Sequence, residues 1–93
     1  MEEADWTYRG EYIRQRHGVE PEWADEALAD PDALRIEPDP ASRTGRSVRT
    51  IGYSRSASDL LTVITVTESA AIYGINSWRS NDTDRRRYEE GLS

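Results

Sequence analysis

The hydrophobic and polar positions between residues 60 and 79 predict a β-hairpin. Residues 60–67 are apolar nearly throughout and rich in β-branched side chains, which is typical of a central strand covered on both faces. The polar pair Glu68 and Ser69 interrupts the run and predicts the turn. The rest of the chain is expected to cover this hairpin.

The second half of the hairpin alternates between two faces. With a period of two, one face carries Tyr73, Ile75, Ser77 and Arg79, and the other carries Ile72, Gly74, Asn76 and Trp78. A charged residue at the end of a core strand is unusual, so Arg79 is the first candidate functional residue.

Two helices are predicted before the sheet. The first follows the expected N-cap Asp5 and ends at Gly18, a residue suited to stop a helix. The second begins at Pro21 and ends before Pro31. Four residues that recur at helical spacing form one stripe of the first helix: Trp6, Gly10, Ile13 and His17.

Residues 33–37 and 46–54 alternate as well and predict two further strands. A last helix is expected to end at Gly91, with N-cap candidates among residues 80–84. All connections between the strands are short, so the four-stranded sheet is expected to be mainly antiparallel. The prediction is a single α+β domain over residues 1–93, with two N-terminal helices and one C-terminal helix.

Composition narrows the class of protein. The hydrophobic fraction is only 35% and the charged fraction is 32%, which indicates a thin core with one sheet face or edge free for a partner. Cysteine is absent, which excludes disulfides and thiolate metal sites and suits a cytoplasmic protein. No apolar run approaches the roughly 18 residues of a membrane span, so no membrane association is expected.

The charge is divided along the chain. Residues 1–39 carry four arginines and twelve acids (net −8), whereas residues 40–93 carry eight arginines and six acids (net +2). The overall charge of −6 argues against broad non-specific binding of nucleic acid, although a local group of arginines can still hold a few phosphates. The simplest interpretation of the acidic half is a solvated helical surface.

The residue types allow one kind of chemistry. The sequence contains no glycine-rich phosphate loop, no metal-ligand spacing and no nucleophile beside a base, so neither a metal nor a cofactor is expected. Arginines, tyrosines and the single histidine, His17, could cleave RNA through its 2′-hydroxyl. In that reaction a base removes the 2′ proton, a cation stabilises the phosphorane and an acid protonates the leaving oxygen.

Three stretches, in order, resemble the BrnT-like toxins of bacterial type II toxin–antitoxin pairs, which have the RelE-type ribonuclease fold. They are RQRHGV at 14–19 with the following helix up to Pro31, TIGYS at 50–54 with the apolar strand after it, and INSWR at 75–79 with RRRYEEG at 85–91. The resemblance implies a metal-independent messenger-RNA endonuclease, free or on the ribosome, that a partner antitoxin neutralises.

The resemblance and the chemistry together give the candidate site residues. Arg79 matches the arginine that ends the last strand of the family, Tyr88 matches the tyrosine of its terminal helix, and Trp6 answers a tryptophan near the amino end. The expected catalytic residues are Arg79, His17 and Tyr88; the expected RNA contacts are Arg49, Arg85, Arg86 and Trp6. Whether the chain also forms a homodimer stays open.

Each of these residues also has a purely structural interpretation. Arg79 could pair with Glu89 or Glu90, and His17 could complement the dipole at a helix C-terminus. The arginines at 85–87 could form a solvated helix face, and the aromatic residues could simply pack. The acidic half and the absence of lysine therefore leave a second hypothesis open, a catalytically inactive protein-interaction or inhibitory module of the same fold.

Overall fold

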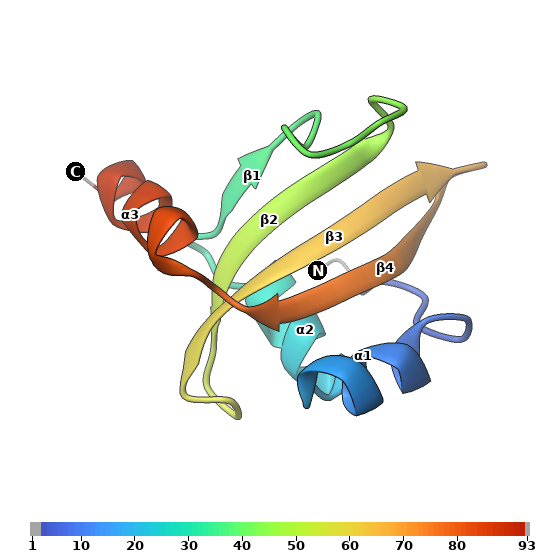
Figure 1. Cartoon of the computed structure of the whole chain (residues 1–93), viewed down its shortest axis with the longest axis horizontal. Helices are drawn as coiled ribbons and strands as arrows, with labels where there is room; N and C mark the ends of the chain where they lie inside the picture. The colour runs from blue at the N-terminus through green and yellow to red at the C-terminus, as the bar shows by residue number, and fades with distance from the viewer. Residues whose placement is uncertain (1–2, 93) are drawn as a thin grey trace.

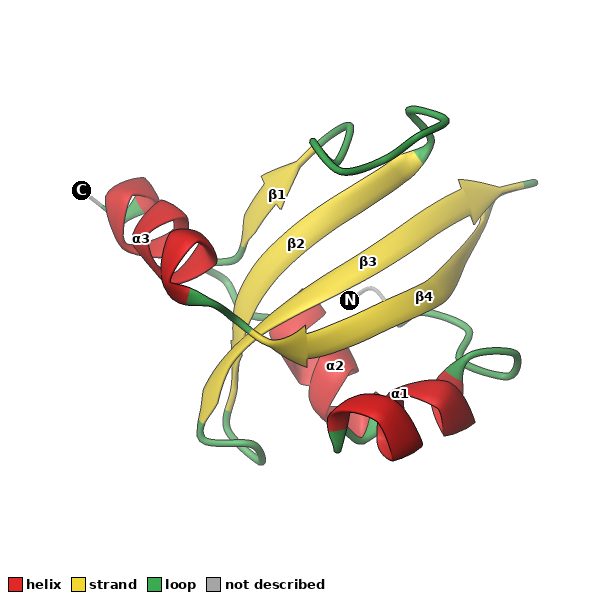
Figure 2. Cartoon of the chain, viewed as in Figure 1, coloured by secondary structure: helices red, strands yellow, loops and turns green. Residues whose placement is uncertain are grey.

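The fold is α+β, as predicted, with the element order α-α-β-β-β-β-α (Figures 1 and 2). The computed structural model describes residues 3–92. The strands form one antiparallel sheet in the order β1-β2-β3-β4. The elements are α1 (Gly10–His17), α2 (Pro21–Leu28), β1 (Leu34–Ile36), β2 (Ser47–Ser54), β3 (Asp59–Glu68), β4 (Ala71–Arg79) and α3 (Asp82–Gly91).

The start of α1 differs from the prediction. Asp5 does not cap a helix, because its backbone pairs with the edge of β4: its N–H donates to Ile72 O at 2.8 Å, and Gly74 N–H donates to its carbonyl at 2.9 Å. The chain is therefore extended at Asp5, and the helix begins only at Gly10. Gly18 ends α1 in the left-handed conformation with φ of 65°, as its sequence position indicated.

The second helix begins at Pro21, as predicted, and lies very close to the sheet. Its buried residues Ala24 and Ala27 pack in the core with Leu61 and Val63 of β3. At Gly52 of β2 a side chain would overlap the backbone of Ala27, so glycine permits this close approach. Small residues on both elements thus set the distance between α2 and the sheet.

The helices divide between the two faces of the sheet (Figure 1). Helix α1 lies against β4 and helix α2 against β2 and β3, whereas α3 lies beside β1 and β2 on the opposite face. Only one end of that opposite face is covered by α3, which leaves the rest without a helix. No helix within residues 3–92 is long and apolar enough to cross a membrane.

A β-bulge interrupts the pairing of β3 with β4. Thr65 pairs with Gly74 and Ile64 pairs with Asn76, so Ile75 has no partner of its own. The extra residue reverses which face of the sheet the side chains on its two sides occupy. The predicted alternation is therefore wrong for residues 72–74 relative to residues 76–79.

The bulge decides which way the end of β4 faces. Arg79 pairs with Leu61, a core residue under the helices, so its side chain lies on the α1–α2 side of the sheet. Tyr73 pairs with Val66 and lies on the opposite side, not with Arg79 as the simple alternation predicted. The functional candidate at the strand end therefore points toward α2.

Candidate functional site

Two arginines meet on one carboxylate where β3 begins and β4 ends. Arg79 donates from Nη1 to Oδ2 of Asp59 at 3.1 Å, and Nη1 of Arg85 in α3 lies 2.8 Å from Oδ1 of the same residue. Antiparallel pairing places the first residues of β3 beside the last residues of β4, and α3 starts just beyond them. These three residues are called the Asp59 cluster.

The Asp59 cluster is open to water and carries a net positive charge. The side chain of Arg79 is 46% exposed and that of Arg85 is 35% exposed. The hydrogen bond from Arg85, followed by that from Arg79, lowers the pKa of Asp59, so this carboxylate is ionised at neutral pH. Within the described chain both arginines use only Nη1, which leaves the remaining N–H groups of two guanidiniums available to an anion.

Arg79 is further fixed by neighbours on the helix side of the sheet. Its Nη1 also donates to the carbonyl of Ala57 in the β2–β3 turn at 3.2 Å, and its guanidinium lies 5.9 Å from the ring centroid of Trp23. The carboxylate that pairs with it is Asp59, not Glu89 or Glu90, and the pair is exposed. Asp59 was not among the predicted site residues, although pairing of the two hairpin strands places the start of β3 beside the end of β4.

A second arginine–carboxylate group is buried on the opposite face. Arg49 donates to Asp39 at 2.8 Å and to Asp84 at 2.6 Å, and Arg87 donates to the other oxygen of Asp84 at 2.9 Å. The hydroxyl of Thr62 also donates to Asp84, at 2.8 Å. The four charged residues, Arg49, Asp39, Asp84 and Arg87, are called the Asp84 network.

The Asp84 network uses the arginine that was expected to contact RNA. The side chain of Arg49 is 11% exposed and that of Asp84 is 1% exposed. Burial alone lowers the pKa of Arg49, but the hydrogen bond that it donates to Asp39 and the charges of both carboxylates raise it above its usual value. An RNA phosphate at Arg49 would have to compete with two internal carboxylates.

His17 lies in an aromatic group at the end of α1. Its ring centroid is 6.0 Å from that of Tyr12 and 5.9 Å from that of Trp78. Its Nε2 is buried and has no hydrogen-bond partner within residues 3–92. Because Trp78 directly precedes Arg79, His17 lies at the same end of β4 as the Asp59 cluster.

Tyr88 belongs to a separate hydrogen-bonded group. Its hydroxyl donates to Oδ2 of Asp30 at 2.7 Å, and burial together with this bond raises the pKa of Tyr88 to about 12. The phenol is therefore protonated at neutral pH and acts as a donor. Within the described part of the chain, no hydrogen bond, ion pair or ring contact gives any two of the three expected catalytic residues a common partner.

The other two expected RNA contacts differ in exposure. Trp6 is buried: its ring lies over Gly74, and its Nε1–H donates to Asp25 at 3.0 Å. That position matches the packing interpretation of this tryptophan. Arg86 is exposed on α3 and makes no hydrogen bond or ion pair with any described residue.

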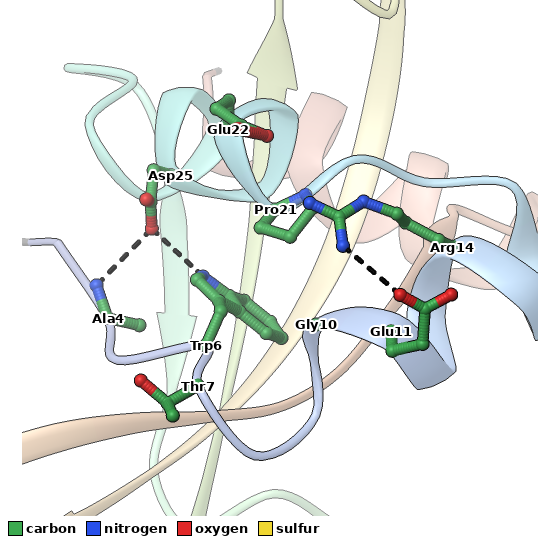
Figure 3. A pocket seen from close by; sticks show the side chains of 9 residues that line it. All are labelled: Ala4, Trp6, Thr7, Gly10, Glu11, Arg14, Pro21, Glu22 and Asp25. Atoms are coloured by element: carbon green, nitrogen blue, oxygen red, sulfur yellow. Dashed lines mark hydrogen bonds and ion pairs between the residues drawn. The ribbon is translucent and has the colours of Figure 1, made fainter.

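An acidic cavity of about 450 Å³ lies between the N-terminal segment, α1 and α2 (Figure 3). Asp25 accepts hydrogen bonds there from Trp6 and from the backbone of Ala4. Burial raises the pKa of Asp25 more than these bonds lower it, and no cation within residues 3–92 pairs with it. The charged residues that line the cavity are Glu11, Arg14, Glu22 and Asp25.

A second cavity, of about 430 Å³, lies where α2 ends and the β2–β3 turn begins. It is called the Tyr53 cavity after the exposed aromatic residue in its lining. Its lining combines apolar surface with two carboxylates and one arginine: Glu26, Ala29, Asp30, Pro31, Tyr53 and Arg55.

No group of three or more His, Asp or Glu side chains within residues 3–92 is arranged to hold a metal ion. No protein-family model matches the chain, and no curated protein is similar to it in sequence. The Asp59 cluster and the two cavities are the candidate functional sites of the described chain.

Proposed function

We propose that the chain binds RNA through the Asp59 cluster and cleaves it without a metal ion, as a toxin that a partner antitoxin neutralises. The observation that carries the proposal is the convergence of two solvent-accessible arginines on one carboxylate, each through Nη1 of its guanidinium. Guanidinium groups bind phosphate oxygens in pairs and stabilise the charge of a phosphorane. The α+β layout agrees with the fold that the sequence resemblance implies.

In this proposal the roles divide among residues at one end of the sheet. Arg79 and Arg85 hold the phosphate, and His17 transfers a proton to or from a sugar oxygen. Tyr88 stays protonated at neutral pH, so it donates a hydrogen bond and does not act as a base. His17 would have to reach the phosphate from the Trp78 side of β4.

A second candidate function is a catalytically inactive interaction module. The observation that favours it is the acidic cavity between α1 and α2, where three carboxylates face one arginine. A basic partner would find there a surface of complementary charge. The two candidates differ in one measurable property, the cleavage of RNA.

The test combines growth with a cleavage assay on purified protein. Inducing the chain in a bacterium should slow growth and degrade messenger RNA, and co-expression of the protein from the neighbouring reading frame should reverse both effects. Purified His17→Ala should cleave RNA about 10²–10⁴-fold more slowly, at an unchanged melting temperature.

Two results would move the conclusion to the interaction module. The first is normal growth with intact transcripts at confirmed expression of folded protein. The second is a His17→Ala variant that loses stability but cleaves as fast per folded molecule, which would limit this histidine to packing.

A further inference from the structure

Two segments of the chain connect the Tyr53 cavity with the Asp59 cluster. The first is the β2–β3 turn: Arg55 lines the cavity, and the carbonyl of Ala57 accepts a hydrogen bond from Arg79. The second is α3, where Arg85 of the cluster and Tyr88 lie three residues apart on one side of the helix. Tyr88 donates to Asp30 in the wall of the cavity, so the cavity and the cluster belong to one end of the molecule.

The lining of the cavity suits a flat ligand with N–H donors. The ring of Tyr53 is 43% exposed, and Ala29 and Pro31 add apolar surface. The volume of about 430 Å³ lies within the range of small-molecule pockets. Hydrogen bonds, mainly from Ser56, lower the pKa of Glu26, so this wall of the cavity carries an ionised acceptor.

The hydrogen bonds already present leave both carboxylates with acceptor capacity. Among residues 3–92, Oε1 of Glu26 accepts from the Ser54 hydroxyl and the Ser56 amide, whereas Oε2 accepts only from the Ser56 hydroxyl. Oδ2 of Asp30 accepts two bonds, whereas Oδ1 accepts only from the Asp32 amide. Since each oxygen has two lone pairs, Glu26 and Asp30 each retain one acceptor position for a ligand.

We propose that the Tyr53 cavity binds a guanine base of the RNA whose phosphate lies on the Asp59 cluster. This inference rests on the proposed function and adds a base preference to it. Guanine alone presents two adjacent donors, N1–H and the 2-amino group, on its Watson–Crick edge. Adenine and cytosine place a ring-nitrogen acceptor beside their amino group, and uracil flanks its single N–H with two carbonyl oxygens, so those acceptors would meet a carboxylate.

Tyr53 and Arg55 complete the expected contacts. An exposed aromatic ring stacks on any base, which contributes affinity, whereas the two carboxylates discriminate between bases. Arg55 is exposed at the cavity wall and balances one of the two carboxylates. The site therefore combines stacking, donor recognition and an adjacent phosphate position.

The experiment titrates the folded full chain with the 3′-monophosphates of guanosine, adenosine, cytidine and uridine, and separately with inorganic phosphate. Amide chemical shifts report binding without any cleavage step. Guanosine 3′-monophosphate should bind about tenfold more tightly than the other three nucleotides, the discrimination expected of a two-donor contact. Inorganic phosphate should shift amides around Arg79 and leave those of the cavity unchanged.

Tyr53→Ala should weaken all four nucleotides about tenfold while leaving phosphate binding intact. The backbone of Tyr53, and not its ring, bonds Asp30, so the truncation preserves the fold. Tyr8→Ala is the matched control, because Tyr8 is 77% exposed and its ring contact is with Tyr73 on β4. That control should bind every ligand as the unaltered chain does.

The outcomes separate the two proposals. Equal affinity for the four nucleotides, a preference for another base, or a Tyr53→Ala variant that binds like the unaltered chain would overturn the guanine site. In those cases phosphate binding at Arg79 would still support the proposed function. Failure of phosphate to bind at Arg79 would overturn the proposed function, and the inference that rests on it.

Discussion

The two arginine–carboxylate groups on this sheet differ in burial and in the balance of charge. In the Asp84 network two arginines meet two carboxylates, and Asp84 itself is fully enclosed. In the Asp59 cluster two arginines meet one carboxylate, and both arginines reach water. The first group is neutral and encloses Asp84, Asp39 and Arg49, with only Arg87 reaching water, whereas the second is positive and open.

That difference separates a structural role from a binding role for the same residue type. A buried ion pair is costly to break, because the remaining charge has no water to solvate it. An exposed pair contributes little to stability, because water and salt screen it. We expect the Asp84 network to hold α3 on the sheet and the Asp59 cluster to remain available for an external anion.

Asp84→Ala should produce the largest effect. It leaves Arg49 buried with one partner fewer and removes the acceptor of Thr62, so the free energy of unfolding should fall by about 3–5 kcal/mol. Urea unfolding followed by tryptophan fluorescence measures the change. Asp59→Ala is the matched control and should cost less than about 1 kcal/mol. Equal losses in the two variants would remove the distinction between the groups.

Arg79→Lys tests the binding role of the open cluster. Lysine keeps the charge but lacks the planar fork, so RNA cleavage should fall about 10²-fold at an unchanged melting temperature. Arg46→Lys is the matched control, since Arg46 forms an exposed ion pair with Glu68 at 2.9 Å near the other end of the sheet. Full activity of Arg79→Lys would show that the guanidinium only pairs with Asp59.

The pH dependence of stability should reveal the ionised state of Asp59. Its pKa in the folded chain lies below the ordinary value of 3.8, so its stabilising contribution is present above that value and is lost as pH falls through the folded pKa. Asp59→Asn should therefore be less stable than the unaltered chain by up to about 1 kcal/mol at about pH 6, and the difference should be smaller at a second pH well below 3.8. Acid-dependent urea unfolding measures both values, and a constant difference would contradict the assignment.

The smallest effect is expected at Asp25, a carboxylate with no arginine partner. Burial raises its pKa above the ordinary value of 3.8, so the free energy of unfolding falls as pH rises above that value, and the full loss is reached above the folded pKa. Asp25→Asn retains an oxygen to accept from Trp6 and Ala4 and should raise the free energy of unfolding at pH 7 by about half a kcal/mol. Thermal unfolding at pH 7 measures it. A clear destabilisation would mean that the charge itself is needed in the acidic cavity.

The strands and their pairing could be predicted from the sequence because period-two patterning and short connections are local signals. The apolar run in β3 and the alternation in β2 needed no tertiary information. The start of α1 could not be predicted in the same way. Local propensity at Asp5 favoured a helix cap, and long-range pairing with Ile72 and Gly74 overrode it.

The candidate site was only partly predictable for the same reason. Arg79 was a candidate because it is a charge at a strand end. Its partner Asp59, 20 residues away in the sequence, has no local signal and could be found only by pairing the two strands of the predicted hairpin. Arg85 joins them only because α3 turns back toward the start of β3, a direction that no sequence period encodes. The Tyr53 cavity is lined by the end of α2 and by the start of the β2–β3 turn, and the sequence alone does not predict that these two segments meet.

The bulge at Ile75 has a consequence for how this chain tolerates changes of length. Since Ile75 has no partner across the sheet, its deletion would restore a regular ladder and leave Trp78 and Arg79 on their present faces. In the central strand β3, by contrast, the loss of one residue would move every later side chain of the strand to the other face of the sheet. Length variation within the sheet should therefore be concentrated at this one position of β4.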